Sequence, residues 1–514
     1  MSTPVALNAV QKTLILIAVC IASITMPLNF TAAAVAIPAI GRSFDGTPIA
    51  LNWVTNAFML TFGSGLMAAG ALADHYGRKT VFIAGISGFS LFSAASTFAP
   101  NLLSFDLLRA AQGIAAAAAF SGGMAALAQE FDGAQRVRAF SYVGSSFGIG
   151  LAFGPIASGL MIQALGWQAV FLLITVLAVI ATVLGIRYMR ESRNPGADGV
   201  DWLGAITFTW ALTIFTYAIL KAPENGWGDS VVISLFLCAF VSFVAFVVIE
   251  QRTAHPMLDL TLFRFPRFVG VQLLAAAPAY AYVVLLILLP IRFIGMDGMN
   301  EVDAGQLMIA LSAPLLVLPI GAGYMTRWLK PSTICGVGLL ISACGLYWLS
   351  QVPDGSQTIE IAIPLLVIGI GISLPWGLMD GLAISVVPKE RAGMATGIFS
   401  TTRVAGEGVA VAVVTAILSG LTARNLTGLS ANSASDTTAA AQRLVTGDIT
   451  KAASLSPGID HNLLIQSYSA AFSTLLIILT AITVVTAAVV FLSLDRGNTD
   501  YETSSPEENL DTPA

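Results

Sequence analysis

The sequence predicts an all-α polytopic membrane protein, and two observations carry that prediction. Of the 514 residues, 56% are hydrophobic and only 10% are charged, whereas soluble proteins carry about 25% charged residues. Fourteen apolar runs are spaced along the chain, each close to the length of about 20 residues that a helix needs to cross a bilayer. Each run must be helical because lipid offers no hydrogen-bond partner to an open backbone.

The expected spans follow one another closely and leave mostly short connections. They are 14–40, 50–73, 79–98, 102–128, 139–164, 168–188, 202–221, 230–249, 269–291, 305–328, 332–350, 361–387, 394–420 and 466–494. The first run is long and uncharged, and no small-residue cleavage site follows it. It is therefore expected to stay as a helix and not to be removed as a signal peptide.

The distribution of lysine and arginine predicts that both termini are cytoplasmic. With the N-terminus inside, 16 of the 24 basic residues fall in cytoplasmic segments and six fall outside, while Arg109 and Arg403 lie within spans. Basic residues accumulate in cytoplasmic loops. The polar stretch of about 421–463 is then one large outer loop, and the acidic residues 496–514 form a disordered cytoplasmic tail.

A weak internal repeat divides the chain into two halves. The pattern Gly-Ala-x7-Lys at 70–79 recurs at 321–330, and Arg-Ala-x4-Gly at 138–144 recurs at 391–397, at offsets of 251 and 253 residues. Parallel repeats around a central path are a transporter architecture. The predicted organisation is an N-terminal six-helix bundle (1–195), two inserted transmembrane helices (196–254), a C-terminal six-helix bundle (255–495) and the tail (496–514).

The loop between the second and third spans carries the most specific motif. It contains Gly70, Asp74, Gly77, Arg78 and Lys79. Here the sequence resembles the major facilitator superfamily, whose signature at this loop is a Gly, an Asp, a Gly and then Arg or Lys. The resemblance implies that these five residues control closure of the cytoplasmic side, with Asp74 pairing with Arg78 or with a helix end. A loop that only sets topology would explain the two basic residues but not the spaced Gly and Asp.

Two further spans sharpen the resemblance to one branch of that family. Span five is rich in glycine around Gly150, Gly154 and Pro155, where small residues allow close helix packing and proline weakens the helix. This pattern is similar to the signature of the facilitator antiporters, although close packing alone also accounts for it. Arg109-Ala-Ala-Gln112-Gly113 in span four is similar to the same motif in fourteen-span drug:proton antiporters.

The resemblance to these antiporters implies a substrate cavity lined by spans one, four, nine and twelve. The candidate lining residues are Asn29, Arg109, Gln112, Gln272, Tyr280, Tyr282, Trp376 and Asp380. The chain departs from the pattern at Asn29, where the antiporters usually carry an aspartate. Asparagine can hydrogen-bond a substrate but cannot carry a proton, so proton coupling through span one is in doubt.

Charged side chains inside the spans predict where protons are carried. They are two arginines against three carboxylates, a net charge of −1: Asp106, Arg109, Asp380, Arg403 and Glu407. Asp106 is expected to pair with Arg109, and Glu407 with Arg403 one turn away. Asp380 has no cation on its own helix and is therefore expected to be the main proton carrier, with Glu407 as a secondary or structural carboxylate and Arg403 as its partner.

The function predicted from these features is secondary active transport, as proton-coupled efflux of small amphipathic or drug-like compounds across the plasma membrane (the inner membrane of a bacterium) by a monomer. Transport of a specific anionic metabolite is the alternative, favoured by Asn29, Arg109 and Arg403. Nucleic-acid binding is excluded because 29 acidic residues outnumber 24 basic ones. No catalytic or metal-binding cluster is visible, so an enzyme is not expected, and no cofactor is implied beyond the proton motive force. A receptor or scaffold would need neither the interior charges nor the repeat.

Overall fold

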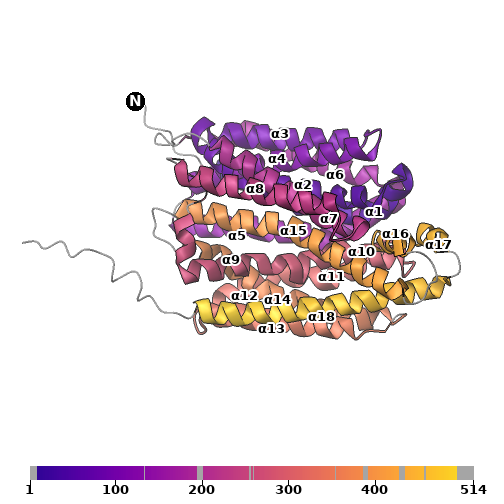
Figure 1. Cartoon of the computed structure of the whole chain (residues 1–514). Helices are drawn as coiled ribbons and strands as arrows, with labels where there is room; N and C mark the ends of the chain where they lie inside the picture. Colours follow the sequence, from indigo (N-terminus) through magenta and orange to yellow (C-terminus); the bar gives the residue numbers. More distant parts are fainter. Residues whose placement is uncertain are drawn as a thin grey trace, which may run out of the picture.

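The computed structural model describes residues 9–131, 133–193, 201–253, 256, 258, 260–353, 355–385, 392–427, 434–456 and 459–494. All regular secondary structure in this part of the chain is helical. The long helices run side by side in one bundle, with α3, α4 and α6 at one side and α13 and α18 at the opposite side (Figure 1). This architecture confirms the all-α prediction.

The described residues hold 13 helical segments that are long and apolar enough to cross a membrane, and the bent helix α5 brings the number to 14. Each predicted span overlaps one of these segments. Ten of these segments are single helices: α1 (Ala9–Phe44), α2 (Pro48–Tyr76), α3 (Arg78–Ser96), α4 (Leu102–Glu130), α6 (Gln168–Tyr188), α7 (Trp202–Asn225), α8 (Ser230–Arg252), α13 (Pro331–Ser350), α14 (Thr358–Ser385) and α18 (His461–Leu494). To these are added α5 (Gly133–Leu165) and α15 (Ala392–Thr427).

Two spans are interrupted within the bundle. The ninth span consists of α9 (Pro266–Pro278), the π-helix η2 (Ala279–Val283) and α10 (Val284–Gly295), and the short 3₁₀ helix η1 (Leu260–Arg264) precedes it. The tenth consists of α11 (Glu301–Ser312) and α12 (Pro314–Met325). A proline inside a helix removes one backbone hydrogen bond, which explains why both interruptions contain or adjoin one.

Helix α5 bends by 43° between Tyr142–Leu151 and Phe153–Leu165. The break is at residue 152, three residues before Pro155. The missing proline N–H leaves the adjacent carbonyl of Leu151 without its helical partner. The sequence therefore explains both the long fifth span and its kink.

The helices pack in two groups that meet along a common face. Within the first group α1 packs on α5, and α4 packs on α2 and α3; within the second, α14 packs on α12 and α13, and α13 packs on α18. The groups meet where α2 contacts α15 and where α5 contacts α11. Helices α7 and α8 pack on each other, and α7 lies against α2 and α15. This pattern is compatible with the predicted halves and inserted pair, whose boundaries remain a prediction.

The polar stretch 421–463 differs from the expected large loop. Helix α15 extends to Thr427, and two short helices follow, α16 (Ala434–Val445) and α17 (Ile449–Leu455). In α16, Ala440, Ala441, Leu444 and Val445 are buried, which is the spacing of one face of a helix. The low hydropathy of the stretch hid this amphipathic pattern. The predicted tail, 496–514, lies outside the described residues.

Candidate functional site

A central cluster forms around Arg403, a buried arginine of α15. Its Nη1 lies 3.3 Å from Oδ1 of Asp380 on α14. The guanidinium carbon also lies 5.5 Å from the ring centre of Phe399 and 5.9 Å from those of Trp376 and Phe147. Because Phe147 belongs to α5, the cluster lies where the two groups of helices face each other.

The two partners of this ion pair differ in exposure. The Asp380 side chain is 59% exposed, whereas that of Arg403 is 8% exposed. The carboxylate therefore lies at the surface of the described chain, whereas the arginine lies between the two groups of helices. The site therefore combines a negative group with aromatic rings, a combination that attracts flat or cationic compounds.

The expected pair of Arg403 and Glu407 is wrong, because Arg403 pairs with Asp380 instead. Two side chains four residues apart can meet on a helix surface, but the long arginine side chain reaches across to α14. Glu407 is 2% exposed and forms no hydrogen bond or ion pair with any residue of the described ranges. It remains close enough to Arg403 to interact with its charge through space.

The two candidate tyrosines of the ninth span point to different neighbours. The Tyr282 hydroxyl lies 3.0 Å from Oγ of Ser312, and its ring centre lies 6.1 Å from that of Trp376. The Tyr280 hydroxyl bonds instead to Thr486 of α18 at 2.5 Å. Only Tyr282 therefore joins the central aromatic cluster. Both lie in the π-helix η2, a rare element that occurs often at functional sites.

Gln272 of α9 is a candidate ligand contact for a physical reason. The side chain is buried, and neither its amide oxygen nor its amide nitrogen has a hydrogen-bond partner among the described residues. A buried polar group without a partner costs about 1–3 kcal/mol. A bound solute or water would recover part of that cost, and α9 packs beside α14 and α15.

A second polar cluster surrounds Arg109 inside the first group of helices. Its Nη1 donates at 2.7 Å to both Asn29 Oδ1 and Gln112 Oε1, and its Nε donates at 2.9 Å to the carbonyl of Val54. The guanidinium carbon lies 4.9 Å from the ring centre of Phe58. Three of the predicted cavity residues are thus brought together, and they join α1, α2 and α4.

Two expectations about this cluster are corrected. Asp106 does not form the expected ion pair with Arg109, whose donors go to Asn29, Gln112 and a backbone carbonyl, and Oδ1 of Asp106 has no hydrogen-bond partner in the described chain. Arg109, Asn29 and Gln112 were also expected to line an open cavity. All three are 0% exposed, so in this conformation they connect helices inside the first group.

The motif between α2 and α3 contains the predicted ion pair. Nη2 of Arg78 lies 3.0 Å and Nε 3.2 Å from Oδ1 of Asp74, and Nη1 lies 2.5 Å from Oε1 of Gln129 on α4. The pairing of Asp74 with Arg78 is confirmed. Lys79 donates to the carbonyl of Ile186 on α6 at 3.0 Å. The loop therefore connects α2 and α3 to both α4 and α6.

The structure adds Glu191, a residue that the sequence analysis missed. Helix α3 begins after Gly77, at φ 118°, without a side-chain cap, and Glu191 supplies one by accepting the backbone N–H groups of Lys79 and Thr80 at 3.2 and 3.1 Å. Partial burial raises the pKa of Glu191, but the hydrogen bonds donated to it outweigh that effect and hold the pKa below its usual value. A possible indication in the sequence is that Gly77, at the start of α3, has no side chain to cap the helix, so a residue from elsewhere must do so.

Asp74→Asn is expected to slow transport without preventing insertion, because the charge-assisted hydrogen bonds with Arg78 are weakened. Such bonds contribute about 1.5–3 kcal/mol when enclosed and less at a half-exposed site such as this one. Gly70→Leu is tested beside it. A Cβ at Gly70 would meet no atom within 4 Å, so this substitution changes the motif without an immediate clash at that atom. Initial transport rates in vesicles, normalised to inserted protein, measure both. If both variants transport at the wild-type rate, the loop only sets the topology of the chain and does not control transport.

Glycines set the spacing of the helices around span five. A Cβ added at Gly150 would lie 2.6 Å from Cγ of Pro27, and one at Gly154 would lie 3.1 Å from Cβ of Thr31. Both contacts are with α1, so α1 and α5 approach closely, as the glycine pattern predicts. Gly63 of α2 is equally close to α15, and the sequence analysis did not single it out.

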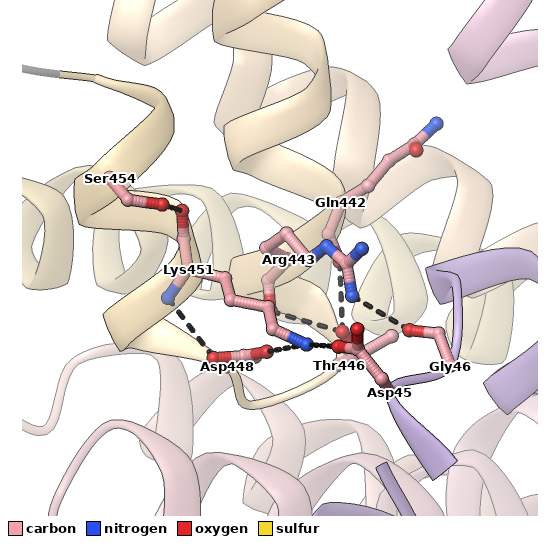
Figure 2. A network of polar contacts seen from close by, with 8 residues as sticks. All are labelled: Asp45, Gly46, Gln442, Arg443, Thr446, Asp448, Lys451 and Ser454. Carbon is pink, nitrogen blue, oxygen red and sulfur yellow. Dashed lines mark hydrogen bonds and ion pairs between the residues drawn. The ribbon is translucent and has the colours of Figure 1, made fainter. Parts of the chain in front are cut away.

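Polar contacts join the two groups of helices at the end opposite to Asp74 and Arg78, the end predicted to face outward (Figure 2). Lys451 of α17 forms an ion pair with Asp45, which follows α1, and lies 3.7 Å from Asp448. Nη1 of Arg443 on α16 donates to the carbonyl of Gly46 at 2.7 Å. We call these five residues the outer clasp. The hydrogen bond and the charge of Lys451 hold the pKa of Asp45 below its usual value.

A helical bundle with buried charges between two packed groups defines a multi-span membrane transporter. The chain belongs to the Major Facilitator Superfamily, whose sequence profile matches residues 19–411. It is 30% identical over 386 residues to the multidrug resistance protein Stp of Mycobacterium tuberculosis (strain CDC 1551 / Oshkosh), covering 75% of this chain and 72% of that protein. It is 26% identical over 411 residues to the tetracenomycin C resistance and export protein of Streptomyces glaucescens, covering 78% and 74%.

Solved structures of the same fold resemble the chain over nearly its whole length. A bacterial homologue of the human lysosomal transporter Spinster, in an inward-facing and unoccupied conformation, gives a TM-score of 0.65 at 14% identity and covers 95% of this chain and 98% of that one. A D-xylose–proton symporter gives a TM-score of 0.60 at 14% identity, covering 93% and 97%. These likenesses establish the fold.

Proposed function

We propose that the protein exports small amphipathic or drug-like compounds in exchange for protons. The observation that carries the proposal is the central cluster, in which Arg403 pairs with an exposed Asp380 among aromatic rings while Glu407 lies buried nearby. The relatives in Mycobacterium and Streptomyces, a multidrug resistance protein and an antibiotic resistance and export protein, support export as the direction.

The two carboxylates of the cluster have different roles in this proposal. Glu407 can take up a proton without giving up a hydrogen bond or an ion pair, whereas protonation of Asp380 breaks its pair with Arg403. A cationic substrate that binds to Asp380 from the cytoplasm displaces Arg403. The freed guanidinium then favours the ionised form of Glu407, which releases its proton inward. Binding of substrate and release of a proton are thereby linked.

Alternating access supplies the remaining step. In this proposal the outer clasp holds the outer ends together while Asp380 is exposed, as expected of an inward-facing state. In this proposal the halves 1–195 and 255–495 rock about the central cluster, the inserted pair 196–254 stays at the side, and both termini are cytoplasmic. The protein acts as a monomer in the plasma membrane, which is the inner membrane in a bacterium, and needs no cofactor besides the proton motive force.

The electrical driving force is sufficient for useful accumulation. One charge moved through about 100 mV supplies about 2.3 kcal/mol, and each 1.4 kcal/mol corresponds to about a tenfold concentration ratio. One proton therefore supports a gradient of about fiftyfold for an uncharged substrate. Exchange of one proton for one monovalent cation moves no net charge, so the pH difference alone drives it.

The decisive experiment uses purified protein in vesicles that carry a pH gradient and an enclosed pH-sensitive dye. Amphipathic cations are expected to accelerate proton movement in protein-containing vesicles and not in protein-free ones. Absence of compound-dependent proton movement across a broad panel, with transport down the substrate gradient retained, would make the protein a uniporter.

Transport of a specific anionic metabolite is the second candidate, because Arg109 and Arg403 are buried cations and Asn29 is neutral. The same vesicles distinguish it when organic anions replace the cations. Anion flux that is lost in Arg109→Gln or Arg403→Gln and that exceeds any cation flux would favour this candidate.

Breaking the outer clasp is expected to shift the protein toward outward-open states. In Lys451→Met the ion pair with Asp45 is lost, so spin labels at Ser43 and Ser454 in a background without native cysteines should report longer and broader distances. Arg424→Gln, which removes an exposed outer charge elsewhere, is the control. An unchanged distance distribution in Lys451→Met would contradict a gating role for the outer clasp.

The pH dependence of the outer clasp follows from the lowered pKa of Asp45. A carboxyl whose pKa is lowered in the folded state stabilises that state above its ordinary value of about 3.9, and the contribution is lost as the pH falls through the lowered value. The spin-label distances should therefore stay constant between about pH 5 and 8 and lengthen only in stronger acid.

A further inference from the structure

A small polar cavity lies where α2, α7, α15 and α16 meet. Its volume is about 20 Å³, and a water molecule needs about 10–15 Å³, so the cavity has room for one water. Leu220 of α7 is among the apolar residues that close it. Its polar wall is formed by one residue of α2, two of α15 and one of α16: Asn52, Thr415, Ser419 and Gln442.

Two hydroxyl groups in this wall have no partner on the described chain. Thr415 and Ser419 are each 4% exposed, and neither hydroxyl forms a hydrogen bond with a described residue. A hydroxyl on a helix can bond back to a carbonyl one turn earlier, as Thr422 of the same helix does to Leu418 at 2.8 Å. Because a buried polar group without a partner is costly, the two side chains indicate a ligand that accepts hydrogen bonds from them.

Two amide side chains complete the surroundings of such a ligand. Nδ2 of Asn52 donates to the carbonyl of Pro48 at 3.0 Å, which leaves the side-chain oxygen of Asn52 to accept a hydrogen bond. The amide oxygen of Gln442 can also accept one. Two hydroxyl donors and two amide acceptors match the two acceptor and two donor positions of a water molecule. The described residues that line the cavity are all uncharged, so a cation matches less well.

The cavity lies on the contact between the two groups of helices. A Cβ at Gly63 of α2 would lie 2.6 Å from Cα of Ala405 on α15. We call this close contact of α2 with α15 the seam. Toward the outer end of the seam, Asn52 of α2 and Thr415 of α15 line the same cavity. A ligand bonded to both side chains therefore bridges the two groups.

The cavity is near the outer clasp and separate from the central cluster. Gln442 directly precedes Arg443 of the outer clasp, and its side chain points away from the ion pair of Asp45 with Lys451 (Figure 2). On α15, Thr415 lies about 18 Å from Arg403 along the helix axis, at 1.5 Å per residue. A ligand here does not occupy the transport site, and the inference does not depend on which compound is transported.

We propose that the cavity binds one ordered water while the outer side is closed. The water accepts hydrogen bonds from Thr415 and Ser419 and donates to the amide oxygens of Asn52 and Gln442. It joins α2, α15 and α16 and is therefore a component of outer closure. When the two groups separate at the outer end, the four side chains part and the water is released to the outer solution.

A map of the full-length protein in lipid nanodiscs, at a resolution that shows ordered waters, tests the site directly. Molecules that are closed on the outer side should show density within hydrogen-bond distance of both Oγ1 of Thr415 and Oγ of Ser419. Absence of that density, or hydroxyls turned back to the carbonyls of Val411 and Thr415, would overturn the proposal.

Substitutions at Thr415 separate the hydroxyl from its packing. Thr415→Val keeps the shape and removes the hydroxyl, so the open fraction in the outer spin-label distances should rise about fivefold, the factor for one net hydrogen bond. Thr415→Ser keeps the hydroxyl and should stay close to wild type. Thr422→Val is the matched control, because its hydroxyl already bonds within α15. A larger effect in Thr415→Ser than in Thr415→Val, or wild-type distances in Thr415→Val, would contradict a bound water.

Thermal unfolding in sodium chloride and in choline chloride at equal concentration distinguishes water from a cation. A bound water predicts the same unfolding midpoint in both salts. Stabilisation by sodium that is lost in Thr415→Val would place a cation in the cavity and overturn the proposal.

Discussion

Glu407→Gln is expected to abolish transport driven by a pH gradient while leaving exchange of substrate down its own gradient intact. Glutamine keeps the size of the side chain but cannot carry a proton. Because Glu407 forms no ion pair or hydrogen bond with a described residue, its replacement removes only the through-space interaction with Arg403, and the variant should insert normally. Proton movement and substrate exchange, measured in the same vesicles, separate the two effects.

Asp380→Asn provides the contrast. It weakens the pair with Arg403, but an ion pair with a side chain that is 59% exposed contributes only up to about 1 kcal/mol, which corresponds to about a fivefold change. Transport should therefore fall by about that factor through weaker binding of cations. Glu407 should still carry the proton, but its release should depend less on substrate because Arg403 is no longer held by Asp380.

If Asp380→Asn loses proton-coupled transport and Glu407→Gln keeps it, Asp380 is the main proton carrier, as expected from the sequence. Full coupling in both variants would rule out proton antiport through this cluster. Arg403→Gln tests whether Arg403 links substrate binding to proton release. Substrate exchange should remain possible in this variant, but proton release should no longer depend on substrate.

Gly154→Val is expected to eliminate transport and to destabilise the protein. The added atoms meet Thr31 on α1, whose hydroxyl already donates to the carbonyl of Pro27 at 2.9 Å, so the two helices must separate. Overpacking of this kind costs about 1–3 kcal/mol. Thermal unfolding followed in detergent and transport per inserted molecule in vesicles measure the two consequences.

Gly144→Val is the matched control on the same helix. A Cβ at Gly144 meets no atom within 4 Å, and this glycine is exposed. It should keep wild-type transport and stability. Normal transport in Gly154→Val would show that α1 and α5 tolerate a wider spacing and that the glycine pattern serves packing without serving movement.

The spans were predictable because each one is a long apolar run, and lipid enforces helical structure on such a run. The kink of α5 and the pairing of Asp74 with Arg78 also follow from local spacing. In contrast, α16 was missed because its apolar residues are mostly alanines within a polar stretch. Local hydropathy does not reveal a helix that is stabilised by packing on a distant segment.

The central cluster was predicted only in part. Its residues were identified as interior charges and aromatics, but the partner of Arg403 was assigned by proximity on one helix. The actual partner, Asp380, is 23 residues away on the neighbouring helix. Phe147 and Glu191 were missed for the same reason, since their contacts depend on how separate helices are placed and no spacing within one helix encodes them.

The outer clasp has a consequence for biogenesis. Asp45 and Lys451 are 406 residues apart in the chain. Ribosomes add about 5–20 residues per second, so about 20 to 80 s separate the synthesis of the two residues. During that interval the nascent N-terminal helices depend on their own contacts, among which the hydrogen bonds of Arg109 join α1, α2 and α4. The contact between Asp45 and Lys451 therefore cannot form until nearly the whole chain has been made, long after the first helices become free to pack on one another.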